Sequence, residues 1–188
     1  MDALEALTTR KSAAMLVDPA PGDQELEQIF TAAVRAPDHG CIRPWRFIVF
    51  RGKMRKELGQ ILGDALKKKD PEASDEAYEK ELNKPFRAPL VIAVIAKVSE
   101  ETKIPPIEQI ISAGAAAQNI MIAAHALGFA GIWRTGPPSF DEYVRSRLGA
   151  VGKDHIVGFI YLGTAKTVPA MPEVPLSDHV MEWKAVSG

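Results

Sequence analysis

Three groups of cationic and hydroxyl residues have the chemistry that binds a phosphate. In chain order they are Arg10, Lys11 and Ser12, then Arg35 and His39, then Arg134 and Thr135. Guanidinium, ammonium and hydroxyl groups donate the hydrogen bonds that a phosphate accepts. Each group follows a segment that we expect to be regular structure. If the ends of these segments converge, they form a pocket for a phosphorylated cofactor. Taken alone, residues of the types at 10–12 more often form an exposed polar turn than an anion site, and the segment by itself does not decide between the two.

Other kinds of site have weaker support in the sequence. The four histidines are His39, His125, His155 and His179. They are far apart and none has a partner at metal-ligand spacing, so we expect no catalytic metal. Cys41 lies too close to His39 in sequence for the usual Cys–His catalytic pair. The acidic residues are spread over helices and form no pair suited to glycoside chemistry. We therefore predict no catalytic acid or base.

A long apolar helix is expected between Pro106 and Leu127, and the other elements must pack around it. Its apolar residues occupy nearly every side, which indicates burial in a core or against another subunit. A membrane span is the rival interpretation, but Glu108, His125 and the amides between them interrupt the apolar run too often. Gly128 is expected to end the helix and begin a strand that leads to Arg134 and Thr135.

The remaining periodicity predicts an α+β sandwich, with helices on both faces of a mixed sheet. Helices are predicted at 2–9 (with Leu4 and Leu7 facing inward), 23–35, 52–69, 71–83 and 140–148, and strands at 47–50, 90–98 and 155–163. The 71–83 helix is the most polar, and we expect it to be mobile or to cover another element. A doubly wound fold is the alternative, but no strand leads into a glycine-rich phosphate loop.

Composition narrows the class of protein further. The chain has 188 residues, a formal charge of −1 and one cysteine. The balanced charge does not favour binding to nucleic acid or to a membrane surface, and the single cysteine suits a reducing compartment. No secretory signal is recognisable, so we expect a cytoplasmic protein. We expect one domain over residues 1–188, in which residues 164–188 form an extended, proline-rich tail.

Three motifs, in this order, resemble the flavin-dependent nitroreductase family. They are RKS at 10–12, RAPDHGCIRPWRF at 35–47 and GFAGIWRTG at 128–136. The resemblance extends from about Met1 to Gly163 and is strongest to the small members of the family. It implies a nitroreductase-like α-β-α sandwich, with a central mixed sheet around a long buried helix. It also implies a homodimer with two flavin mononucleotide (FMN) sites, each built from both chains.

The resemblance further implies an oxidoreductase that passes electrons from NADPH or NADH to nitroaromatic compounds, quinones or similar acceptors. Matched to the family motifs, the FMN-binding residues are Arg10, Lys11, Ser12, Arg35, His39, Trp133, Arg134 and Thr135. Arg35 and His39 are expected to reach the flavin of the partner chain, and Arg134 to add a contact to the FMN phosphate. Ala123 to Gly128 is expected to lie near the nicotinamide nucleotide. The proline-rich tail is expected to pack over the partner subunit.

Lys11 stands where an Arg is common in the family, and two positions in the proline loop also depart from the family pattern. Larger relatives carry Asn and Gln in the proline loop, where this chain has Cys41 and Arg43. Amide contacts to the flavin ring are therefore not expected from this loop. The departure leaves a flavin-binding or redox-sensor module without turnover as the alternative function. A third possibility is an enzyme of related fold that consumes its flavin.

Overall fold

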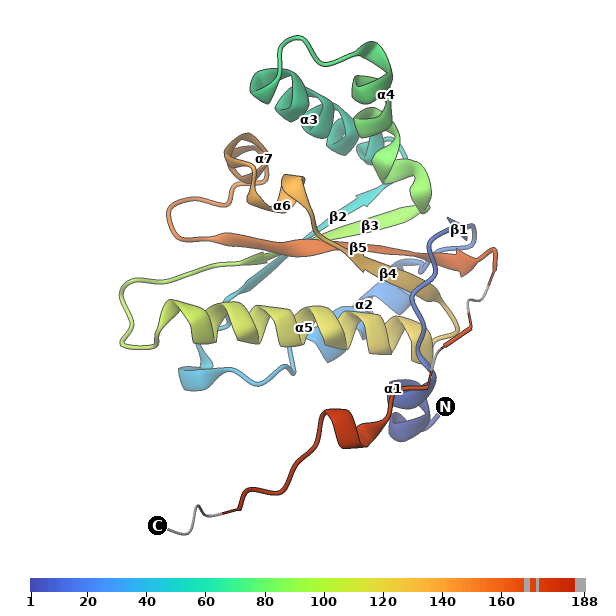
Figure 1. Ribbon diagram of the computed structural model, residues 1–188, viewed down its shortest axis with the longest axis vertical. Coiled ribbons are helices and arrows are strands. Elements are labelled where there is room, and N and C mark those ends of the chain that lie inside the picture. The colour runs from blue at the N-terminus through green and yellow to red at the C-terminus, as the bar shows by residue number, and fades with distance from the viewer. Residues whose placement is uncertain (168–169, 172, 185–188) are drawn as a thin grey trace.

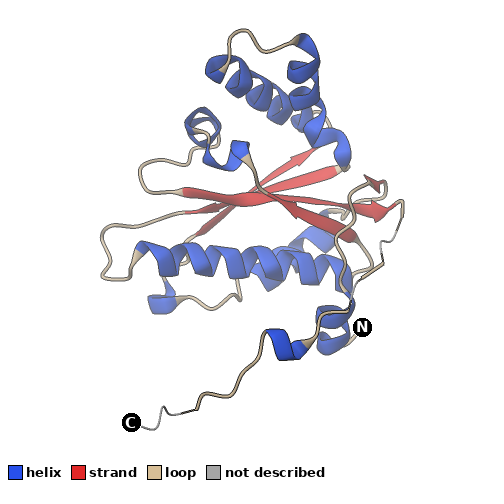
Figure 2. Ribbon diagram, viewed as in Figure 1, coloured by secondary structure: helices blue, strands red, loops and turns tan. Residues whose placement is uncertain are grey.

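The computed structural model describes residues 1–167, 170–171 and 173–184, and its centre is a five-stranded sheet (Figure 2). The strands are β1 (Leu16–Val17), β2 (Trp45–Arg51), β3 (Leu90–Ala96), β4 (Ala130–Arg134) and β5 (His155–Ala165). They follow the order β1-β5-β3-β2, and β4 pairs with β5. All four longer strands were expected from the sequence. Strands β2, β3 and β5 were predicted from their apolar runs, and β4 from its place after Gly128. The two-residue β1 was not predicted, because so short a segment has no readable period.

The sheet is less mixed than the sequence suggested. Every ladder among the named strands is antiparallel, including β3 with both β2 and β5. Among the described residues, the one parallel pairing is an isolated bridge between Ser12 and Gly131. An apolar run predicts that a strand is buried but not its direction, so the mixed character that we expected is limited to this bridge.

Helices cover both faces of the sheet, which confirms the predicted α-β-α sandwich (Figure 1). On one face lie α2 (Asp23–Ala33) and α5 (Pro106–Ala126), and on the other lie α3 (Met54–Lys69), α4 (Asp75–Asn83), α6 (Pro137–Phe140) and α7 (Glu142–Arg147). The buried strand β3 supplies both cores by alternation. Leu90, Ile92 and Val94 pack toward α5, and Val91, Ala93 and Ile95 pack toward α3.

The long helix α5 begins and ends where the sequence indicates. Pro106 stands at its first position, Glu108 lies in its first turn, and Gly128 follows its end with a positive φ of 88°. Only one side of the helix is buried within the chain, however. Ile107 and Ile111 are 60% and 63% exposed on the outward side. Among the described residues, no helix is long and apolar enough to cross a lipid bilayer.

The polar helix α4 packs against α3 through two glycines. A Cβ added at Gly59 would lie 2.3 Å from the carbonyl oxygen of Leu82, and one added at Gly63 would lie 2.7 Å from the Tyr78 ring. The absence of these Cβ atoms allows the two helices to approach closely. The predicted 71–83 helix therefore covers α3, although it begins later than expected, at Asp75.

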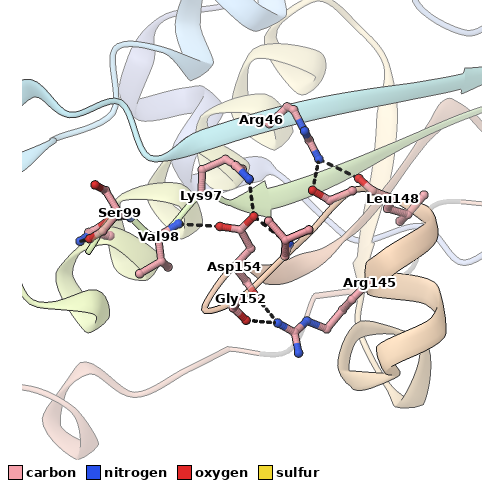
Figure 3. Close-up of polar contacts among 11 residues, drawn as sticks. Arg46, Lys97, Val98, Ser99, Arg145, Leu148, Gly152 and Asp154 are labelled. Atoms are coloured by element: carbon pink, nitrogen blue, oxygen red, sulfur yellow. Dashed lines mark hydrogen bonds and ion pairs between the residues drawn. The ribbon is translucent and has the colours of Figure 1, made fainter. Parts of the chain in front are cut away.

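A buried carboxylate ties together the loops at the ends of β3 and β5 that lie nearest the start of α5 (Figure 3). Asp154 accepts hydrogen bonds from the Lys97 ammonium, from Val98 N at 2.9 Å and from Val151 N at 3.0 Å. Arg145 donates to the Asp154 carbonyl oxygen at 2.8 Å. Burial alone would raise the pKa of Asp154, but the donors from Lys97, Val151 and Val98 outweigh it and hold that pKa below its ordinary value.

The two chain termini present apolar side chains to solvent. In α1 (Ala3–Thr9), Ala6 is buried, whereas Leu4 and Leu7 are 74% and 55% exposed, so the expectation that these leucines face inward was wrong. A seven-residue helix at the edge of the chain has room to bury only one narrow stripe. In the tail, the exposed apolar residues include Leu176, Val180, Met181 and Trp183. Residues 168–169, 172 and 185–188 of the predicted tail lie outside the described residues.

Candidate functional site

The N-terminal cationic segment, residues 10–12, lies beside β4. Such an approach is one of those that the predicted pocket would need. Ser12 forms a parallel bridge with Gly131, and Ala13 N donates to the Gly131 carbonyl oxygen at 3.1 Å. A Cβ at Gly131 would lie 2.7 Å from a Leu162 methyl carbon, so glycine keeps the strand close to the neighbouring β5 side chain. The first predicted group therefore lies beside Gly131 of β4, three residues before Arg134 of the third group.

Arg10 has a hydrogen-bond donor without an acceptor. It directly follows α1, whose last residue, Thr9, has its hydroxyl 2.9 Å from His125 Nε2 near the end of α5. Arg10 Nη1 is buried and has no partner among the described residues. A buried guanidinium donor left unpaired is costly, so this position suits an anionic ligand. Lys11 is half-buried beside it, and Ser12 is exposed.

The end of β4 directs its side chains to both faces of the sheet. The Trp133 indole packs with the α2–α5 core, and its Nε1 donates to the Val157 carbonyl oxygen at 3.3 Å. Gly158 makes this possible, because a Cβ there would lie 2.2 Å from the indole nitrogen. Arg134 lines a cavity on the α3 side, where its Nε is buried without a partner among the described residues. Thr135 is exposed at the mouth of the same cavity.

Arg35 and His39 lie in a different part of the chain. Arg35 is exposed just beyond α2, where it lines a hollow of about 260 Å³ together with Asp38, Cys41 and Arg43. His39 opens the short 3-10 turn η1 (His39–Cys41), and its Nδ1 lies 2.7 Å from the Glu108 carboxylate in the first turn of α5. Both partners of this ion pair are substantially exposed to solvent.

The second predicted group is therefore not brought to the other two within one chain. His39 contacts the first turn of α5, whereas Thr9, next to Arg10, contacts its last turn. A helix of 21 residues is about 30 Å long at 1.5 Å per residue. One FMN molecule cannot contact both ends of α5 in the same chain.

The residues expected near the nicotinamide nucleotide lie at the C-terminal end of α5. Ala123 is half-buried and packs against the α2–α5 core, and Gly128 is exposed just beyond the helix. This end also carries His125, which contacts Thr9. The 123–128 segment thus lies on the same side of the chain as Arg10. Neither residue has a side chain that selects one nucleotide over another.

The proline loop has an unusual backbone. Cys41 and Arg43 both have positive φ angles, 53° and 52°, which non-glycine residues rarely adopt. Arg43 N donates to Asp38 Oδ2 at 2.6 Å, while Asp38 Oδ1 is buried without a partner among the described residues. Both the Cys41 and Arg43 side chains are exposed, so the residues at the two departures from the family pattern face outward.

A cationic cavity on the α3 face was missed by sequence reasoning. It has a volume of about 380 Å³ and is lined by Lys84, Arg87, Arg134 and Tyr161 among others. Lys84 and Arg87 belong to the 3-10 turn η2 (Lys84–Arg87), which connects α4 to β3. In the sequence they are two ordinary cations near a helix end. Only the pairing of β4 with β5 places them opposite Arg134.

Comparison with known proteins identifies the family and the fold. The profile of the family described as "Nitroreductase family" matches residues 8–164. "Putative NAD(P)H nitroreductase YdjA" of Escherichia coli (strain K12) is 44% identical over 164 residues, which covers 87% of this chain and 88% of that protein. A nitroreductase-like family protein from Bacillus cereus has a TM-score of 0.83 at 20% identity, covering 98% of this chain and 97% of that one. A structure described as a "putative nitroreductase in complex with fmn", from Desulfovibrio desulfuricans, has a TM-score of 0.73 at 22% identity, covering 98% of both chains.

Proposed function

This chain belongs to the nitroreductase family and is thus an oxidoreductase, and from that premise we propose that it uses FMN to pass electrons from NADPH or NADH to nitroaromatic compounds, quinones or similar electron-poor acceptors. When bound, FMN supplies the redox chemistry in alternating half-reactions with the donor and the acceptor. The protein residues bind and orient the flavin and exclude water from it. The name of the E. coli relative and the FMN in the D. desulfuricans structure support this proposal.

The observation that carries the proposal is the unpartnered guanidinium of Arg10. Its buried Nη1 lacks an acceptor, and Lys11 and Ser12 follow it directly beside β4. A phosphate offers several oxygen acceptors and a negative charge, which would satisfy this donor. We therefore assign the FMN phosphate to residues 10–12, with Trp133 and Thr135 at the end of β4 beside the flavin. The phosphate contact predicted for Arg134 is not part of this assignment, because its side chain lines the cavity on the α3 side, whereas Thr9, next to Arg10, contacts α5.

The separation of His39 from Arg10 supports a homodimeric site. The two residues lie at opposite ends of α5, near Glu108 and His125, which are about 25 Å apart along the helix axis at 1.5 Å per residue. A two-fold axis near the middle of α5 would place the N-terminal end of one copy beside the C-terminal end of the other. Arg35 and His39 of each chain would then face the FMN bound by Arg10 of its partner.

The outward side of α5 has the composition of such an interface. Ile107 and Ile111 are exposed there, and Ile110, Ala115 and Ile122 are only half-buried. The apolar residues on nearly every side of this helix are thus explained if its outer side packs on a second copy. We propose that α5 forms the centre of the dimer interface.

The C-terminal tail is a second candidate for contact between subunits. Its described part carries Leu176, Val180, Met181 and Trp183 with most of their surface exposed. We propose that this tail packs over the partner subunit, as expected from the sequence. Deleting residues 167–188 should then weaken dimerisation in sedimentation experiments. A truncated protein that remains a fully flavinated dimer would contradict this part of the proposal.

For the electron donor, we propose that the nicotinamide nucleotide approaches residues 123–128. The support is their place at the same end of α5 as Arg10, together with the exposure of Gly128. Because this end is proposed to hold the flavin, a nucleotide bound here would lie next to it. Hydride transfer to a flavin needs no protein acid or base, so no catalytic proton donor is assigned.

The deciding experiment is a visible absorption spectrum of the purified protein, before and after NADPH or NADH is added without oxygen. A bound flavin that loses its absorption confirms the oxidoreductase. Bound flavin that stays oxidised with both nucleotides identifies the alternative, a binding or sensor module. Flavin that is destroyed with oxygen uptake identifies a flavin-consuming enzyme. A protein that does not bind added FMN would contradict the proposal altogether.

A further inference from the structure

The cationic cavity on the α3 face has an excess of positive charge. Lys84 forms an ion pair with Glu81, so its charge is largely balanced. Arg87 and Arg134 have no carboxylate within ion-pair distance in the part of the chain that the structure describes. Arg134 Nε is buried and lacks an acceptor there. Two guanidinium groups facing one cavity repel each other unless an anion lies between them.

Tyr161 adds a neutral hydrogen-bond donor to this cavity. Its side chain comes from β5 and is 5% exposed, and it lines the cavity together with both arginines. Burial raises the pKa of Tyr161, while Arg87 and Arg134 act to lower it, and the net pKa is above its ordinary value. The phenol therefore stays protonated at neutral pH and can donate a hydrogen bond to an anion.

A more apolar groove continues from the cationic cavity. It has a volume of about 1170 Å³ and runs between α3 and the α6–α7 segment, where Leu66, Phe140 and Tyr143 line it. Phe140 is 75% exposed there. The cavity and the groove are continuous, because the same residues line both: Leu62, Lys84, Gly136, Pro137 and Pro138. The groove is also lined by charged residues of both signs, which are Lys68, Lys69, Asp70, Glu81, Lys84, Asp141 and Glu142. The combined space thus has a cationic end and a wider end that carries aromatic side chains.

We propose that this space binds the electron acceptor, and that the acceptor is an aromatic compound bearing a carboxylate or a similar anionic group. The anion lies between Arg87 and Arg134 with the Tyr161 hydroxyl, and the ring extends toward the groove beside α6. Guanidinium groups match a carboxylate in shape and charge, and apolar walls match an aromatic ring. This inference rests on the proposed flavin site, because Thr135 lies at both that site and the cavity.

The site differs from the proposed phosphate site of FMN. Arg10 lies next to Thr9, which contacts α5, whereas Arg87 belongs to the turn between α4 and β3 on the other face of the sheet. At the end of β4, the Trp133 indole packs with the α2–α5 core, while Trp133, Arg134 and Thr135 all border the cavity on the α3 side. The two sets of cations thus lie on opposite sides of the β4 end, where a flavin and an acceptor would need to meet.

The test is calorimetric titration of the oxidised, FMN-loaded protein with 4-nitrobenzoate and with its uncharged methyl ester. We expect the wild-type protein to bind the carboxylate about tenfold more tightly than the ester, and this preference to weaken with added salt. Arg87→Gln should reduce the preference to about threefold or less and leave the Kd of FMN and the melting temperature unchanged. Lys80→Gln is the matched control, because Lys80 is an exposed cation on α4 that does not line the cavity.

Two results would overturn the inference. The first is equal affinity of the wild-type protein for the acid and the ester. The second is an Arg87→Gln protein that loses FMN affinity but keeps the preference for the acid, which would assign the cavity to the cofactor. Failure of the proposed function is distinguishable from both. A protein that binds no FMN but still prefers the acid, with the preference lost in Arg87→Gln, would contradict the flavoenzyme and retain the anion site.

Discussion

The two ends of α5 differ in the kind of hydrogen-bonding group that is left without a partner. At the C-terminal end, the Arg10 guanidinium has a buried donor that lacks an acceptor among the residues that the structure describes. At the N-terminal end, close to His39, the Asp38 carboxylate has a buried acceptor oxygen that lacks a donor. The N-terminal end is otherwise well satisfied, because the buried Gln109 side chain bonds to Ser99 N, Ser99 O and Ile104 O.

This difference indicates that each end is half of a site. Contacts within the chain hold Asp38 and His39 in position without a ligand, through Arg43 N and Glu108. The buried Arg10 donor, in contrast, requires an anion to complete its hydrogen bonding. An antiparallel pairing of two α5 helices would bring the anion-binding end of one chain to the acceptor-bearing end of the other. The predictions below test whether the two ends depend on each other in this way.

The largest effect is expected from placing a charge on the outer side of α5. Ile111→Asp should raise the Kd of the dimer by about a thousandfold or more, because the two-fold axis buries two unpaired carboxylates at once. FMN should be lost together with the dimer, as measured by sedimentation and by flavin absorption. Met54→Asp is the control, since Met54 is an exposed apolar residue on the opposite face of the sheet. A monomeric Ile111→Asp protein that retains FMN would show that one end of α5 is sufficient.

The next effect concerns the support of the N-terminal end. Asp154→Asn should lower the free energy of unfolding by about 3 kcal/mol, because it leaves the Lys97 ammonium without its carboxylate. For a chain of this length that corresponds to a fall in melting temperature of about 6–12 °C. A change of less than about 1 °C would show that the loop before α5 does not depend on Asp154.

The same residue predicts a pH dependence with a definite sign. The pKa of Asp154 is lower in the folded protein than its ordinary value of 3.8. Its stabilisation is therefore complete above that value and is lost as the pH falls through the lower folded pKa. The wild-type and Asp154→Asn proteins should thus differ most in stability near neutral pH and converge as the pH falls through the lowered pKa of the folded protein. Denaturant unfolding at a series of pH values measures the difference.

Removing the unpartnered donor at the C-terminal end should have a smaller and more specific effect. Arg10→Gln should raise the Kd of FMN by about 10- to 100-fold, the value of a charge-assisted hydrogen bond. Riboflavin, which lacks the phosphate, should bind the variant and the wild type equally well. Arg51→Gln is the control, since Arg51 pairs with Asp23 at the surface. Equal losses for FMN and riboflavin would move the phosphate away from Arg10.

The sequence predicted the elements better than their contacts. The bounds of α5 followed from Pro106 and Gly128, and β3 followed from its continuous apolar run, since these signals are local. Strand direction was not predictable in this way, because antiparallel and parallel partners bury the same residues. The prediction that Leu4 and Leu7 face inward was wrong for a related reason, because periodicity identifies an apolar stripe on a helix but not the element that covers it.

For the candidate site, the motifs predicted residues 10–12 and 133–135, and the Ser12–Gly131 bridge places residue 12 beside the strand that carries residues 133 and 134. The position of His39 at the far end of α5 was not readable from the motifs, because it depends on which face of the sheet α2 covers. Arg87 was missed for a similar reason. It carries no motif, and its role depends on the cavity that η2 and β4 form together.

The smallest effect is expected at the contact between His39 and Glu108, where orienting a side chain can be distinguished from stabilising the fold. The His39–Glu108 pair is exposed, with 68% and 44% of the two side chains accessible, so it contributes at most about 1 kcal/mol to stability. Glu108→Gln should therefore lower the melting temperature by no more than about 4 °C. If Glu108 orients His39 toward the flavin of the partner chain, the same variant should still weaken FMN binding by about two- to fivefold.

Glu100→Gln is the matched control, because Glu100 forms another exposed ion pair, with Lys153. A Glu108→Gln protein with unchanged FMN affinity would mean that His39 is held by the η1 turn alone, and that the two ends of α5 are coupled only through the interface between them.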